Sequence, residues 1–413
     1  MIGLVIGLRF VKHYRSLLLL CIGYFVDFYD LTIFSVGYSA LFQDQFSITD
    51  TKVIHQLYFS VGIVQTVGIL LGAVICGLLA DRFGRACVLK YSIFLYSVST
   101  FLVLFTHSLP LFFLLRFLAY FGLATEFSTS TVLLVESMPL GAANVGVSLL
   151  YIFGVLGGLT ATVIGFLSWK IMFLLGSVVG LVVYALRSHI LESSVFLRYC
   201  AQTQYSFSGM LQLLRHRNVL KTILRYFLMI IPYQAIITIM FVFPAVFFPS
   251  LPVGFVIKKI LSGFFLGNII SCVVGAYLTH ITKSYKTIMY IAMLLFLALM
   301  TEFYFLNTDT LFLYALCLGL IGGGYPVAWG QQLALTFSPV IRATASNLLF
   351  ALGRAFGIIL NILMIQLIAM PPMMATRLLF WLDVVIGVVG LWMIYRSKNF
   401  YHSTIKTIGS EDK

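Results

Sequence analysis

Residues 116–139 read RFLAYFGLATEFSTSTVLLVESMP, and this stretch carries most of what the sequence says about fold and chemistry. Its apolar length is sufficient to cross the roughly 30 Å hydrocarbon layer of a membrane. It nevertheless contains Arg116, Glu126 and Glu136. A charged side chain within a membrane costs about 3 kcal/mol or more, so such residues need partners, water or a function. The stretch predicts a membrane-spanning helix with a functional role.

The whole chain has the composition of an integral membrane protein. Of 413 residues, 61% are hydrophobic and 9% charged, whereas soluble domains carry about 25% charged residues. The predicted fold class is all-α, with twelve transmembrane helices in two six-helix bundles. Their expected positions are residues 17–41, 54–80, 88–106, 111–135, 143–167, 169–187, 222–248, 254–281, 286–306, 311–336, 343–370 and 374–396.

A polar, basic segment divides these helices into two sets of six. We therefore expect an N-terminal bundle at 1–187, a cytoplasmic linker at 188–221, and a C-terminal bundle with a short cytoplasmic tail at 222–413. Weak similarity at an offset of about 200 residues, such as the turn prolines Pro139 and Pro339, supports two related halves.

The net charge of +13 is distributed unevenly along the chain. Most Lys and Arg fall in segments on one side of the predicted membrane, which by the positive-inside rule is the cytoplasmic side. We expect both termini in the cytoplasm and the protein in the cytoplasmic (inner) membrane. The basic surplus is explained by topology and anionic lipid, and no nucleic-acid partner is expected.

The loop after the second predicted span contains the most specific short motif, GLLADRFGR at residues 77–85. Gly77 permits close approach of another helix, and Gly84 permits a tight turn. Asp81 can form an ion pair with Arg82 or Arg85 that breaks and re-forms, so we expect these residues to act in gating.

Both stretches resemble the major facilitator superfamily. The G-x-x-x-D-R-x-G-R motif is similar to that family's loop between helices 2 and 3. The spacing of Arg116, Glu126, Glu136, Ser137 and Pro139 resembles the fourth helix of metabolite:proton symporters and sialic acid permeases. The resemblance implies alternating access with a substrate site between the two bundles.

Asp27 and Asp30 lie three residues apart in the first predicted span and share one helix face. Buried carboxylates in a membrane usually mark proton or ion pathways. We expect these two and Glu126 to couple transport to protons, and the resemblance agrees. A purely structural polar pair is the alternative.

The substrate is expected to carry an anionic group, because a bidentate Arg–carboxylate pair is a strong recognition contact. Arg116 can instead be neutralised by Asp30, and Arg354 can be a structural partner of Asp383. Aromatic residues within spans are also common core residues. The candidate substrate-binding residues are Arg116, Tyr233, Gln234, Tyr325, Trp329 and Arg354.

The gate is expected where the loop motif meets the second half. The corresponding second-half loops contain Lys283, Lys286 and Arg342 but no acid. Asp81 is predicted to contact Arg342 and the start of its helix, whose free N–H groups favour an anion. Glu136 belongs to the same gating set.

The sequence predicts a secondary active transporter that takes up a small organic acid or zwitterionic metabolite by proton symport. It contains no G-x-x-x-x-G-K-[ST] phosphate loop, and no cofactor, metal site or enzymatic activity is expected. The expected partners are substrate, protons and lipid, and the monomer is expected to be functional. The alternatives are proton-driven drug or metabolite efflux, and a channel or non-transporting sensor.

Overall fold

The computed structural model describes residues 2–202, 216–247, 253–300, 310–368 and 372–397, and every regular element in these ranges is helical. The chain divides into two units. Unit 1 comprises Met1–Leu214 and Phe337–Ala351, and unit 2 comprises Arg215–Thr336 and Leu352–Lys413.

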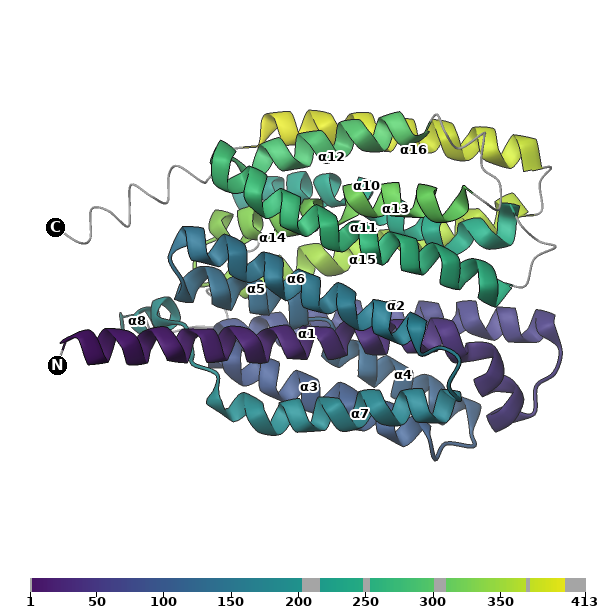
Figure 1. Cartoon of the computed structure of the whole chain (residues 1–413), viewed down its shortest axis with the longest axis horizontal. Coiled ribbons are helices and arrows are strands. Elements are labelled where there is room, and N and C mark those ends of the chain that lie inside the picture. The colour runs from purple at the N-terminus through teal and green to yellow at the C-terminus, as the bar shows by residue number, and fades with distance from the viewer. Residues whose placement is uncertain (1, 203–215, 248–252, 301–309, 369–371, 398–413) are drawn as a thin grey trace. The chain divides into compact units, whose positions relative to one another are not determined.

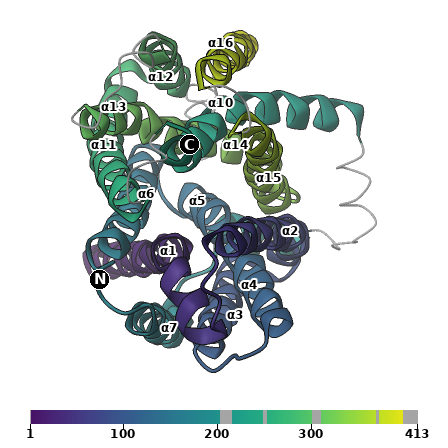
Figure 2. The same ribbon diagram turned by 90° about the vertical axis from the view of Figure 1, so that its right-hand side faces the viewer.

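The long helices of unit 1 run roughly side by side, as Figure 1 shows. Figures 1 and 2 show α3 and α7 side by side, and α1 packs against α6 and α7. In turn, α4 packs against both α2 and α3. The elements are α1 (Ile2–Phe46), α2 (Thr51–Phe83), α3 (Arg85–Val103), α4 (Leu109–Leu123), α5 (Glu126–Ser137), α6 (Leu140–Val163), α7 (Trp169–Leu186), the 3-10 helix η1 (Arg187–His189) and α8 (Ser194–Gln202).

In unit 2, α11 packs against α13, α10 against α16, and α12 against α14 and α16. The elements are α10 (Arg217–Phe247), α11 (Val253–Thr282), α12 (Tyr285–Met300), α13 (Leu311–Gly322), α14 (Gly324–Thr336), α15 (Arg342–Ile368) and α16 (Pro372–Arg396). The division between units falls within α15, after Ala351.

Eight helical segments in the described ranges are long and apolar enough to cross a membrane. They confirm the predicted class of helical membrane protein. Six lie in the first half and correspond to its predicted spans, and two lie at 259–282 and 311–336. The division into bundles at 1–187 and 222–413 stays a prediction.

Glycines allow the closest helix contacts. A side chain at Gly157 would collide with the Phe25 carbonyl of α1, and one at Gly154 would meet the Tyr24 ring. In unit 2, Gly319 and Gly323 similarly face the backbone of α11. Lipid provides no hydrophobic drive for helix association, so membrane helices associate largely through close packing. Small residues permit this packing because they have little or no side chain between the two backbones.

Two predicted spans are interrupted near their middle. The span at 111–135 is divided into α4 and α5 at Ala124 and Thr125, and the span at 311–336 into α13 and α14 at Gly323. Three consecutive glycines at 322–324 weaken the helix there. At the first break, Glu126 occupies the first turn of α5, where the positive end of a helix favours a carboxylate.

Candidate functional site

A buried ion pair joins α5 to the end of α7. The Arg187 Nη2 pairs with Glu126 Oε1, and Arg187 Nη1 donates to Glu126 Oε2 at 3.0 Å. The same nitrogen donates to the Leu89 carbonyl at 2.6 Å. Both side chains are fully buried. Gly23 on α1 provides the space, because any side chain there would collide with the Arg187 guanidinium.

Asp27 and Asp30 are buried on α1 within the same unit, and each is 1% exposed. Asp30 Oδ2 accepts a hydrogen bond from the Thr100 hydroxyl at 3.3 Å. Asp30 also lies within electrostatic range of Arg116, and Asp27 within range of Arg187. The two carboxylates predicted to act together therefore face different arginines.

Arg116 is enclosed inside unit 1. With the Gln65 amide oriented to satisfy both groups, its oxygen accepts from Arg116 Nε and Nη2 at 3.0 and 2.9 Å. The guanidinium carbon lies 4.9, 5.1 and 5.8 Å from the ring centroids of Phe34, Tyr120 and Phe173. These are favourable cation–π distances. The surroundings of Arg116 are thus those of a structural cation.

These five residues form what we call the buried charge cluster: Asp27, Asp30, Arg116, Glu126 and Arg187. Three carboxylates face two guanidinium groups, so one carboxylate is in excess. The Tyr96 hydroxyl, fully buried, lies within electrostatic range of all the cluster's acids and of Arg187. An uncompensated buried charge is costly, so the cluster is neutral when it binds one cation such as a proton.

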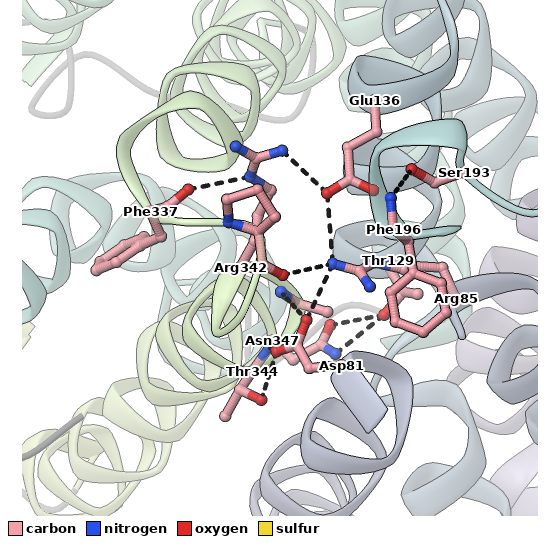
Figure 3. A network of polar contacts seen from close by, with 12 residues as sticks. Asp81, Arg85, Thr129, Glu136, Ser193, Phe196, Phe337, Arg342, Thr344 and Asn347 are labelled. Carbon is pink, nitrogen blue, oxygen red and sulfur yellow. Dashed lines mark hydrogen bonds and ion pairs between the residues drawn. The ribbon is translucent and has the colours of Figure 1, made fainter. Parts of the chain in front are cut away.

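A second polar network lies where α2 meets the start of α15 (Figure 3). Asp81 accepts hydrogen bonds from the N–H groups of Ala343 and Thr344 at 3.1 and 2.7 Å, and from the Thr344 hydroxyl at 2.7 Å. The first N–H groups of a helix have no partner within it, and Asp81 satisfies two of them. One turn earlier, a Cβ at Gly77 would lie 2.9 Å from the Thr344 Cα.

Arg85 and Arg342 converge on Glu136 in the same network (Figure 3). Arg342 Nη1 lies 2.9 Å and Arg85 Nη2 3.3 Å from Glu136 Oε1. Arg85 Nη2 also lies 3.2 Å from Asp81 Oδ1 and donates to the Pro339 carbonyl at 2.7 Å. Two acids and two arginines balance here, in contrast to the buried charge cluster.

The residues after α7 cover this network. The Phe196 ring lies 4.5 Å from the Arg85 guanidinium carbon, and Glu192 Oε2 accepts from the Ala86 N–H at 3.0 Å. Gly84 has a φ of 108°, and a side chain there would collide with the Glu192 carboxylate. Gly84 is therefore required both by its backbone conformation and by this contact.

The network departs from the sequence prediction in one partner. The predicted contact of Asp81 with the helix start is present, whereas Arg342 forms its hydrogen-bonded ion pair with Glu136. Arg342 is held in this direction because its Nε donates to the Phe337 carbonyl at 3.0 Å. Arg82 is exposed and lies 5.0 Å from the Phe83 ring centroid.

The aromatic candidates of unit 2 form hydrogen bonds and ring contacts with other residues of the same unit. The Tyr325 hydroxyl donates to the Met229 carbonyl, and Trp329 Nε1 donates to the Tyr226 carbonyl at 3.2 Å. The rings of Tyr233 and Tyr325 are stacked, with centroids 6.3 Å apart. These bonds favour the core interpretation for Tyr325 and Trp329.

The other unit 2 candidates have separate surroundings. Gln234 is buried, and Arg354 is half-buried. Lys286 donates to the carbonyls of Tyr395 and Ser397 at 3.1 and 2.8 Å, at the C-terminal end of α16. Lys286, in the first turn of α12, thus caps the end of another helix. The side chain of Asp383 lies outside the described residues.

Sequence reasoning missed several partners. It predicted no partner for Arg187, the last residue of the predicted span at 169–187, whereas the structure buries it to 1% exposure beside Glu126. It did not identify Gln65, Thr100 or Asn347. The signal for Arg187 was available, because an excess of buried acids in the first half requires a second buried cation.

Comparisons with known proteins agree with this architecture. The family model of the Major Facilitator Superfamily matches residues 20–360. A protein of Haemophilus influenzae named as a metabolite transporter is 25% identical over 359 residues, covering 83% of this chain and 86% of that protein. A solved proton:xylose symporter has a TM-score of 0.77 at 16% identity, covering 95% of this chain and 97% of that one.

Two further relatives from Acinetobacter baylyi match over shorter ranges. The niacin transporter NiaP is 28% identical over 212 residues, covering 50% of this chain and 47% of that protein. A benzoate transport protein is 27% identical over 176 residues, covering 40% and 36%. The helical fold, the spans and the family match lead to one conclusion: this chain belongs to the Major Facilitator Superfamily and is a membrane transporter, not an enzyme.

Proposed function

We propose that the protein is a proton-coupled symporter that takes up a small aromatic carboxylic acid. The observation that carries proton coupling is the charge imbalance of the buried charge cluster. The cluster contains three carboxylates and two guanidinium groups, and each of these five residues is at most 1% exposed. One proton makes the cluster neutral, and its loss leaves one uncompensated carboxylate.

The proposed substrate class rests on the relatives. Niacin and benzoate, named for two of them, are both small aromatic acids with one carboxylate. Such a substrate requires a cation for its carboxylate and a surface for its ring. Arg116 is already occupied by Gln65 and three aromatic rings. We assign the carboxylate to Arg354, a half-buried arginine on α15.

Tyr233 and Gln234 remain candidates to contact the ring and its substituents. Tyr325 then acts behind Tyr233, because the two rings are stacked and the Tyr325 hydroxyl is bonded to the backbone. We also propose a gating role for Asp81. Its contact with the start of α15 supports this role, because the contact would break if α15 moved away from α2.

The test uses purified protein in proteoliposomes with an imposed pH gradient. Benzoate and nicotinate are offered separately, with xylose as a neutral control. We expect accumulation of at least one acid, abolished by Arg354→Gln and weakened by Arg354→Lys, since Lys cannot form a planar bidentate pair. Arg377→Gln is the matched control at an exposed arginine. Equal uptake by the Arg354 and Arg377 variants contradicts the assignment, and uptake of xylose but neither acid contradicts the substrate class.

A further inference from the structure

The short helix α5 connects the two ionic sites of unit 1. Its first residue, Glu126, belongs to the buried charge cluster, and Glu136 near its end pairs with Arg85 and Arg342. The helix is interrupted before Glu126 and again at Met138, which is extended. The two glutamates are about 15 Å apart along the axis at 1.5 Å per residue. A shift of α5 would therefore move both sites.

The first ten residues of α15 contact α5 at three levels. Arg342 pairs with Glu136 at 2.9 Å, Asn347 Nδ2 donates to Thr129 Oγ1 at 3.0 Å, and the rings of Phe350 and Phe127 are 5.0 Å apart. Residue numbers rise along α15 as they fall along α5, so the two helices run in opposite directions. The contacts extend from the gating network to the residue next to Glu126.

The Asn347–Thr129 hydrogen bond is the polar contact at the middle level. Both side chains are fully buried, and Thr129 lies one turn after Glu126 on the same side of α5. A buried amide that loses its partner is costly, so this bond fixes the register between the helices. Among the described residues, the neighbouring buried hydroxyls of Thr131 and Ser346 have no hydrogen-bond partner.

We propose that Thr129 and Asn347 are positioning residues that transmit the charge state of Glu126 to the docking of α15. Neutralising Glu126 weakens its bond to Arg187 and lets the start of α5 shift. The shift strains the Asn347–Thr129 bond and releases α15 from Asp81. This inference rests on the proposed proton coupling, and it adds the residues that connect the buried charge cluster to the gate.

Hydrogen–deuterium exchange of the purified full chain tests the coupling without substrate or gradient. The N–H groups of Ala343 and Thr344 are bonded to Asp81, so their exchange reports undocking of α15. We expect Glu126→Gln to raise exchange in the peptide covering 337–348 about tenfold, which corresponds to about 1.4 kcal/mol. We expect Thr129→Val alone to raise it by a similar factor.

The decisive comparison is a double-mutant cycle. Glu126→Gln should raise exchange about tenfold in Thr131→Val, a matched loss of a buried hydroxyl, but much less in Thr129→Val. Thr129→Ser, which keeps the hydroxyl, should behave as wild type. The inference is overturned if Glu126→Gln raises exchange by the same factor in Thr129→Val and in Thr131→Val. It is also overturned if Glu126→Gln alone leaves exchange unchanged.

A second pair of variants covers the case in which Thr129→Val does not fold. Asn347→Leu removes the same bond from the other helix, and Ser346→Ala is its control. The increase in exchange caused by Glu126→Gln should be smaller in Asn347→Leu and unchanged in Ser346→Ala. Equal increases in the two backgrounds overturn the inference. Proton-driven uptake is measured separately, so a failure of the proposed function is distinguishable from a failure of this coupling.

Discussion

Replacing Arg187 by Gln should strongly destabilise unit 1. The substitution leaves Glu126 buried without its partner and removes a donor from the Leu89 carbonyl. Removing one member of a buried ion pair costs about 3–5 kcal/mol. For a unit of about 200 residues, each kcal/mol lowers the midpoint of thermal unfolding by about 2–4 °C. The expected decrease is therefore about 6 °C or more.

The assay is thermal unfolding of purified protein in detergent, followed by intrinsic fluorescence at a fixed heating rate. Arg198→Gln, at an exposed arginine, is the control and should change the midpoint little. The double variant Glu126→Gln/Arg187→Gln should recover most of the loss, because it removes both charges. If Arg187→Gln unfolds at the same temperature as Arg198→Gln, or the double variant is less stable than both single variants, the ion pair lacks the assigned role.

Three further predictions concern the surroundings of this pair and the gate. Gln65→Leu should lower the free energy of unfolding by about 1–3 kcal/mol, because it leaves buried donors of Arg116 unpaired. Gln56→Leu is the control at an exposed site, and equal unfolding midpoints for the two variants would exclude the Gln65–Arg116 hydrogen bonds. Gly84→Ala should lower the free energy of unfolding by about 1 kcal/mol or more, because residue 84 has a positive φ that a residue with a Cβ adopts only at a cost. A variant that is more stable than wild type in the same thermal assay would contradict this. Asp81→Asn and Arg342→Ala should each lengthen spin-label distances between α2 and the start of α15, with a double-mutant effect smaller than the sum. Unchanged distance distributions in both single variants would rule out Asp81 and Arg342 as residues that hold the start of α15 against α2.

Sequence alone predicted the properties that depend on local apolar length. The six spans of the first half appear as helices because each contains enough consecutive apolar residues to form one element. The breaks at Thr125 and Gly323 were not predicted, since both lie inside runs that read as continuous. Whether a helix continues through polar or glycine residues depends on its packing against other helices, here α3 and α11. The hydrophobic pattern of the sequence carries no information about that packing.

The candidate sites were predictable where one residue type has a single favourable partner. Asp81 was correctly placed at a helix start, because free N–H groups attract a carboxylate wherever one is within reach. The direct ion pair of Arg342 with Glu136 was not predicted, because Asp81 and Glu136 both lie within electrostatic range of Arg342 and only the folded chain sets the distances. Arg187 was missed because its partner is 61 residues away in sequence.

Proton coupling by the buried charge cluster is tested most directly by comparing two transport modes in the same proteoliposomes. Accumulation driven by a pH gradient requires the proton to move with the substrate, whereas counterflow at equal pH requires substrate exchange alone. For Asp27→Asn, Asp30→Asn and Glu126→Gln, the account predicts that at least one variant loses gradient-driven accumulation of benzoate or nicotinate and keeps counterflow. Gradient-driven accumulation at the wild-type level in all three variants would contradict it.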